Sequence, residues 1–175
     1  RYEELQAVDF VSELSGGENY KGSTSSVEVK KLKKPKLKNV TERAEIRPKT
    51  MEYFEKILLL AKEHDIPVLL INAPYQMTKE DKMVFNTLED YLAQQTLYAD
   101  VKYVDFNTMY KEMGLKFKRD FADENHLNIT GQPKFNKALG EIIVDNYDIP
   151  DRRGDKRFES YEKNLEEFKK EFCLE

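Results

Sequence analysis

The sequence predicts an α/β fold with a parallel sheet, and two neighbouring segments carry that prediction. Residues 67–72, Pro-Val-Leu-Leu-Ile-Asn, form an apolar run without alternation, which is typical of a parallel strand that helices cover on both faces. A helical pattern and a second short strand pattern, at 101–106, follow within about forty residues. Strand, crossover helix and strand in this order form a βαβ unit, and such units build parallel sheets.

Size, charge and cysteine content narrow the class of protein. The chain has 175 residues, the size of one domain, and we expect residues 1–175 to form a single α/β domain. Its 29 Lys and Arg against 33 Asp and Glu give a net charge of −4, so no nucleic-acid partner is expected. One cysteine, Cys173, provides neither a disulfide framework nor a cysteine-rich metal site. No apolar run approaches the ~20 residues of a membrane helix.

The first 48 residues are predicted to be mostly irregular. Apolar residues at helical spacing within 2–14 indicate one short helix, which a Ser-Gly-Gly sequence ends. Residues 26–30 alternate like a half-buried strand, and residues 30–38 then hold six lysines among nine residues. Because Pro35 breaks any helix there and the rest of the chain is acidic, we interpret this lysine run as a solvated loop. Contact with an anionic polymer or membrane surface is the alternative.

Residues 49–147 are predicted to hold the α/β core. An apolar stripe over three turns predicts an amphipathic helix that starts at Pro48 and ends near His64. The sequence Thr-Lys-Glu-Asp at 78–81 has the capping-box pattern and predicts the start of the crossover helix. The two stripes consist of Met51, Phe54, Leu58 and Ala61, and of Val84, Leu88 and Tyr91.

Two further helices and a helical tail are predicted after the second strand. A short helix over 108–113 ends at Gly114, and a longer helix with Pro133 in its first turn starts near Thr130. Residues 148–175 form a C-terminal helical extension, whose apolar face either packs on the core or docks a partner. The two apolar faces consist of Phe135, Leu139, Ile142 and Ile143, and of Phe158, Tyr161, Leu165, Phe168 and Phe172.

The two histidines differ in their surroundings. His64 ends a helix beside Asp65, where a cation suits the helix dipole, so we interpret it as structural. His126 lies in a polar loop between a parallel strand and a helix, where ligands of such sheets gather. Asp123 precedes it by three residues, which lets the carboxylate accept from the imidazole Nδ1–H and leaves Nε2 as a base. A metal site built from Asp123, Glu124 and His126 would lack a second histidine or a cysteine, so no metal is expected.

The segment around this pair resembles a known family. Residues 123–128, Asp-Glu-Asn-His-Leu-Asn, followed by Gly131 and Lys134-Phe135, are similar to the closing block of SGNH/GDSL hydrolases. Residues 51–74 and the tail at 151–161 resemble the corresponding parts of SGNH-like proteins of the bacterial cell envelope. The resemblance covers roughly residues 49–165, and its closing block is the most specific part.

This resemblance implies a fold, an activity and a location. The fold would be a flavodoxin-like three-layer α/β/α domain, with His126 as general base and Asp123 as its orienting partner. Such proteins cleave or transfer acyl esters without a metal or organic cofactor, and their substrates are acylated carbohydrates or envelope polymers. An extracytoplasmic location would imply a leader or a membrane anchor before Arg1.

The chain also departs from the family pattern. No Gly-Asp-Ser motif occurs, and the segment Asn72-Ala73-Pro74 does not match the family's Gly-x-Asn-Asp block, so we interpret Asn72 as a turn residue. Without a serine the base has no hydroxyl to activate. The serines present are Ser12, Ser15, Ser23, Ser25, Ser26 and Ser160, and none of them follows a predicted buried strand.

Three functional interpretations remain open on the sequence. The first is the C-terminal part of a serine esterase or acyltransferase whose nucleophile lies upstream of Arg1. The second is a catalytically inactive SGNH-like module that binds an envelope polymer or acts as a scaffold. The third is a flavodoxin-like regulatory or interaction domain in which Asp123 and His126 are ordinary polar residues of a loop.

Overall fold

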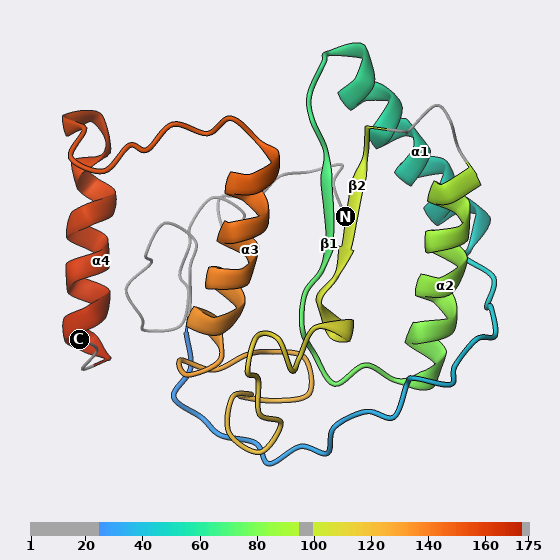
Figure 1. The fold of residues 1–175 in the computed structure, drawn as a ribbon, viewed down its shortest axis with the longest axis horizontal. Helices are drawn as coiled ribbons and strands as arrows, with labels where there is room; N and C mark the ends of the chain where they lie inside the picture. Colours follow the sequence, from blue (N-terminus) through green and yellow to red (C-terminus); the bar gives the residue numbers. More distant parts are fainter. Residues whose placement is uncertain (1–24, 95–99, 173–175) are drawn as a thin grey trace, which may run out of the picture. The chain divides into compact units, whose positions relative to one another are not determined.

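The structure, a computed structural model, describes residues 25–94 and 100–172 (Figure 1). The helix predicted within 2–14 and the side chain of Cys173 lie outside the described residues. The mixed α/β class is confirmed, because the described residues form four α-helices and a two-stranded parallel sheet. They fall into two compact units, Val27–Asp145 and a second unit that includes residues 146–172.

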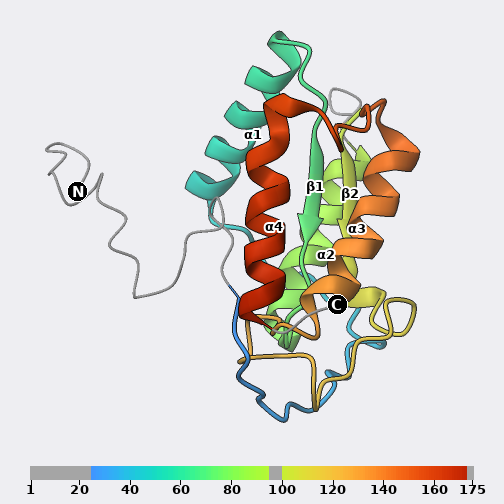
Figure 2. The same cartoon turned by 90° about the vertical axis from the view of Figure 1, so that its left-hand side faces the viewer.

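The sheet lies in the first unit and consists of β1 (Leu69–Asn72) and β2 (Lys102–Asp105). The strands pair in parallel, and their last residues stand opposite each other in the register. The crossover between them contains α2 (Lys79–Gln94), so the predicted βαβ unit is present. Both strands point towards the same group of loops (Figure 2). Ile71 is 42% exposed, so the helices cover the sheet less completely than predicted, because a sheet this narrow leaves surface uncovered.

Helices flank the sheet within this unit. Figure 1 shows α1 (Pro48–Glu63) and α2 on one side of the strands and α3 (Gln132–Asn146) on the other. Phe54 of α1 meets Tyr91 of α2 edge to face, with ring centroids 6.5 Å apart. The apolar stripes read from the sequence therefore join the two helices that lie on the same side.

Local sequence sets the ends of these helices. At the start of α2, the N–H of Thr78 donates to Asp81 Oδ2 (2.9 Å) and the N–H of Asp81 donates to Thr78 Oγ1 (3.1 Å). These reciprocal bonds confirm the predicted capping box. Helix α1 begins at Pro48, as predicted, and ends before His64, whose N–H donates to the carbonyl of Leu60 at 3.2 Å.

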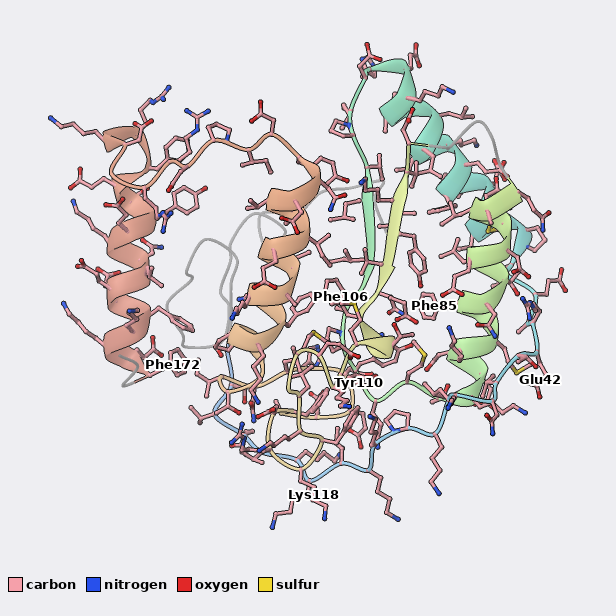
Figure 3. All side chains as sticks on the ribbon, in the orientation of Figure 1. Glu42, Phe85, Phe106, Tyr110, Lys118 and Phe172 are labelled. Atoms are coloured by element: carbon pink, nitrogen blue, oxygen red, sulfur yellow. The ribbon has the colours of Figure 1, made fainter. Side chains whose placement is uncertain are left out.

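The buried core lies mainly in the loops beyond the strands. It consists of Leu32, Phe106, Tyr110, Met113, Leu115, Phe117 and Phe121. Phe106 meets Phe135 of α3 edge to face with centroids 4.9 Å apart, and Phe117 stacks on Phe121 at 4.8 Å. Figure 3 shows Phe106 and Tyr110 at this end of the unit. The predicted apolar face of α3 contributes Phe135, Leu139 and Ile142 to the same packing, so that part of the prediction is confirmed.

Two local predictions are wrong. Residues 26–30 form no strand, and both Val27 and Val29 are exposed. The N–H groups of Lys30 and Leu32 donate instead to the carbonyls of Phe121 (2.9 Å) and Phe117 (2.8 Å). These carbonyls are four residues apart, whereas a regular antiparallel ladder places them two apart. The short helix predicted over 108–113 is absent: a 3-10 turn, η3 (Phe106–Thr108), is followed by hydrogen-bonded turns that end at Gly114. Its apolar residues Tyr110 and Met113 are buried in the core although they form no α-helix.

The second unit contains a 3-10 turn, η4 (Lys156–Phe158), and α4 (Glu159–Glu171). The apolar stripe of α4 is present as predicted, and Phe168 contacts Phe172 with ring centroids 4.7 Å apart. No residue of α4 is buried, and the packing of this helix on the core stays a prediction. Across the described ranges, 25–94 and 100–172, no helix is both long and apolar enough to cross a bilayer.

Candidate functional site

Asp123 and His126 form a close side-chain pair. Both carboxylate oxygens of Asp123 lie 2.9 Å from Nδ1 of His126. The His126 side chain is 74% exposed and that of Asp123 is 45% exposed. No hydrogen bond joins Nε2 of His126 to another described residue, so this nitrogen faces solvent with its lone pair or its proton available.

The backbone of the loop fixes this geometry. The N–H of Ala122 donates to the carbonyl of His126 (2.9 Å) and closes the loop, and Phe121 and Leu127 form a β-bridge at its base. Within the loop, Asp123 Oδ1 accepts from the N–H groups of Asn125 (2.7 Å) and His126 (2.8 Å). These backbone donors hold the carboxylate in position independently of its contact with the imidazole.

These contacts also set the charge of Asp123. The hydrogen bond from His126, together with the backbone N–H of Asn125, holds the pKa of the Asp123 carboxyl below its usual value. Asp123 is therefore ionised at neutral pH and acts as an acceptor for a proton on Nδ1. A neutral imidazole with its proton on Nδ1 carries its basic lone pair on Nε2.

Asn128 holds the end of this loop in the protein interior. Its side chain has 0% exposure, and Nδ2 donates to the carbonyls of Glu28 (3.0 Å) and Arg119 (2.7 Å). Its Oδ1 accepts from the N–H groups of Thr130 (3.0 Å) and Gly131 (3.2 Å). One buried amide therefore joins the N-terminal segment, the loop and the start of α3.

Gly131 and Asp120 complete this support. A Cβ at Gly131 would lie 2.1 Å from the carbonyl oxygen of Asp120, so only glycine fits there. The buried Asp120 carboxylate accepts from Lys134, from the Arg119 side chain and from the N–H of Lys116. Burial raises the pKa of Asp120, but these hydrogen bonds outweigh burial and bring the pKa below its usual value.

A second polar cluster, which the sequence reasoning missed, lies where the strands end. Asn72 is buried, not a simple turn residue, and its Nδ2 donates to Asp105 Oδ1 at 3.1 Å. The same oxygen accepts from the N–H of Asn107 (3.0 Å), while Asp105 Oδ2 is buried without a hydrogen bond. The available signal was the polar residue that ends each apolar strand.

The two polar regions meet along the loop after β1. The N–H of Gln76 donates to the carbonyl of Glu124 at 2.7 Å, so this loop lies against the one that carries Asp123 and His126. On the other side, Lys30 pairs with Glu124 at 2.6 Å. Asp123 and His126 thus lie near the carboxyl ends of the strands, where α/β sheets place their ligand sites.

The nucleophile and the family assignment receive no direct support from these observations. No hydrogen bond links His126 to any of the described serines Ser25, Ser26 and Ser160, whereas Ser12, Ser15 and Ser23 lie outside the described residues. Over the described part of the chain, no group of three His, Cys, Asp or Glu side chains is arranged to hold a metal ion. No family model, curated protein or solved structure matches this chain.

Proposed function

We propose that the chain carries the general-base part of a serine esterase or acyltransferase, in which His126 is the base and Asp123 its orienting partner. The observation that supports this most is the approach of both Asp123 oxygens to His126 Nδ1 at 2.9 Å, with Nε2 left exposed. An ionised carboxylate on Nδ1 and an exposed Nε2 are what a base needs to take a proton from a hydroxyl.

The reaction follows from this arrangement. Nε2 accepts the proton of a serine hydroxyl while the serine oxygen attacks the ester carbonyl. Asp123 stabilises the imidazolium that forms, and Nε2–H then protonates the leaving alcohol as the tetrahedral intermediate collapses. The acyl-serine is then attacked by water or by an acceptor hydroxyl, whose proton passes to Nε2. Attack by water gives a hydrolase, and attack by an acceptor hydroxyl gives a transferase. The serine lies outside the described residues in this proposal.

The substrate class rests on the resemblance of residues 123–128 to the closing block of SGNH/GDSL hydrolases. By that resemblance the acyl ester belongs to a carbohydrate or an envelope polymer, and the protein acts outside the cytoplasm. The βαβ unit, with helices on either side of the strands, is compatible with a flavodoxin-like three-layer domain. This route requires no metal or organic cofactor.

A binding module of the same type is the second candidate. It is favoured by the lack of a hydrogen bond between His126 Nε2 and any described hydroxyl. In that case Asp123 and His126 would present a hydrogen-bonding edge to a polymer and would not perform chemistry.

Hydrolysis of p-nitrophenyl acetate and labelling by a fluorophosphonate distinguish these candidates. We expect the 175-residue chain to hydrolyse the ester faster than buffer does, with the excess lost in His126→Ala and reduced in Asp123→Ala. His64→Ala is the matched control, because it removes the other histidine and should leave the rate unchanged. Intact mass after fluorophosphonate treatment reports whether a serine of this chain is the nucleophile. Equal hydrolysis by the parent and His126→Ala, without an adduct, would contradict a nucleophilic serine in this chain, which leaves a binding module or a nucleophile that this chain does not contain.

A further inference from the structure

A cavity of about 520 Å³ lies beyond the carboxyl end of β2. Asn107, Thr108 and Tyr110, which follow the strand, form one part of its lining, and residues 34–40, which include the end of the lysine run, form another. Ligands of open α/β sheets bind outside the carboxyl ends of the strands, and small-molecule sites enclose roughly 300–1,000 Å³. The cavity therefore has the position and the size of a small-molecule site.

The lining of this cavity is positively charged. Its lysines are Lys34, Lys36, Lys38 and Lys82. Lys82 is 14% exposed and lies 3.7 Å from Asp105 and 3.5 Å from Glu89, so acidic groups match its charge. Among the described residues the other three have no acidic partner, and Lys34 lies over the ring of Tyr110 at 5.9 Å. In a chain of net charge −4, three unmatched lysines around one cavity favour an anionic ligand.

The remaining lining contains one acidic residue, Asp105, whose Oδ2 has no hydrogen bond and lies 3.7 Å from Lys82 Nζ. Apart from Asp105 and Asn39, the other lining residues are apolar or already hydrogen-bonded. Asn107 Oδ1 accepts from the N–H of Tyr75 (3.0 Å), and Asn107 Nδ2 donates to the carbonyl of Ala73 (2.9 Å). The hydroxyl of Tyr110 donates to the carbonyl of Tyr75 at 2.7 Å. These polar groups already have hydrogen-bond partners within the protein. A ligand would therefore contact the ring of Tyr110 and the apolar residues Pro35, Leu37, Val40 and Met77. Such a lining suits an apolar body that carries a charged group.

We propose that this cavity binds a small organic anion. Its phosphate or carboxylate group pairs with Lys34, Lys36 and Lys38, and its apolar body lies against Leu37 and the ring of Tyr110, which Figure 3 shows beyond the strands. The site includes neither Asp123 nor His126, so this proposal does not depend on the proposed function. The lysine run is a loop, as expected, but part of it lines a cavity and does not only face water.

Titrations followed by ¹H–¹⁵N NMR at 0.15 M salt test the proposal, because surface charges are largely screened there beyond ~8 Å. The probes are phenyl phosphate, benzoate and the neutral benzyl alcohol, which share a ring and differ in charge. We expect saturable shifts at Met77, Thr108 and Tyr110 with the anions, and binding at least about tenfold weaker for benzyl alcohol. Tighter binding of phenyl phosphate than of benzoate assigns the site to phosphates, and the reverse assigns it to carboxylates.

Two variants that remove the same charge distinguish binding in the cavity from non-specific attraction of the anion to surface lysines. The triple variant K34Q/K36Q/K38Q should weaken binding of the preferred anion at least about tenfold. The control K49Q/K111Q/K137Q removes the same charge from exposed positions outside the cavity and should bind within about twofold of the parent. Circular dichroism establishes that both variants are folded. Equal binding by the two variants, equal binding of benzyl alcohol, or no saturable shift at the cavity residues would overturn the proposal.

Discussion

The two ends of the unit Val27–Asp145 are built in different ways. Beyond the carboxyl ends of the strands, loop residues such as Phe106 and Phe121 are fully buried. Along the strands and α1, large apolar side chains stay exposed, including Ile57 (63%) and Ile71 (42%). Of the five largest fully buried side chains among the described residues, four lie beyond the strands, and Leu58 of α1 is the exception. The end that carries Asp123 and His126 is therefore the end that packing holds most firmly.

The largest effect should come from removing an aromatic ring at the loop end. Phe106→Ala deletes a ring with 0% exposure that packs edge to face on Phe135, and we expect a loss of about 4 kcal/mol. Ile57→Ala is the matched change at the exposed end and should cost less than about 1 kcal/mol. Urea unfolding of both variants measures the contrast, and similar losses would show that the two ends are equally packed.

The next largest effect concerns the buried carboxylate of Asp120. Asp120→Asn removes the charge that pairs with Lys134 and should cost about 3 kcal/mol at pH 7. Because the folded-state pKa of Asp120 is below its usual value, the carboxylate stabilises the fold above the unfolded-state pKa. This contribution is lost as the pH falls through the folded-state pKa. Urea titrations from pH 7 to pH 2 should therefore show a smaller acid-dependent loss in the variant, and identical pH profiles would contradict this assignment.

Gly131→Ala should give a somewhat smaller loss, about 2 kcal/mol. The added Cβ would meet the carbonyl oxygen of Asp120 at 2.1 Å, so backbone must shift. Gly140→Ala is the control, because a Cβ there meets nothing within 4 Å and alanine favours the helix. Thermal unfolding should show a lower midpoint for the first variant and an equal or higher one for the second. A neutral result at Gly131 would mean that the loop relaxes at no cost.

The smallest effect is a change in titration at the exposed pair. His126→Ala removes the main hydrogen bond that lowers the pKa of Asp123, so this pKa should rise towards its usual value with little change in stability. The backbone N–H groups of residues 125 and 126 remain as donors, so the return should be incomplete. Carbon-13 NMR of the side-chain carboxyls measures the shift. An unchanged Asp123 titration would mean that the two side chains do not interact in solution.

The sequence was most informative where structure is local. The apolar stripe of α1, the capping box at Thr78 and the βαβ order depend on neighbouring residues, and all three are present. The core around Phe106 and Phe121 could not be predicted, because several of its residues stand at helical spacing yet lie in turns and loops. The alternation at Val27 and Val29 wrongly predicted a strand, because such a pattern does not show whether a neighbouring strand is there to pair with.

In the site, too, contacts between residues close in the chain could be predicted and contacts between distant residues could not. Asp123 and His126 are three residues apart, so one loop brings them together and the spacing alone suggested their contact. Asn72 and Asp105 are far apart in the chain and meet only through the register of two strands. The cavity beside Lys34 depends on the path of residues 34–40 beyond the end of β2, which no pattern in the sequence describes.

The position of the proton on the neutral His126 ring shows whether Nε2 can act as the base. The chain has two histidines, so ¹⁵N NMR of the imidazole nitrogens at alkaline pH can resolve each ring. We predict that the neutral ring of His126 carries its proton on Nδ1, that Asp123→Ala abolishes this preference, and that His64 is unaffected by the substitution. A proton on Nε2 of His126 in the parent chain would contradict the account, because that nitrogen could not then act as the base.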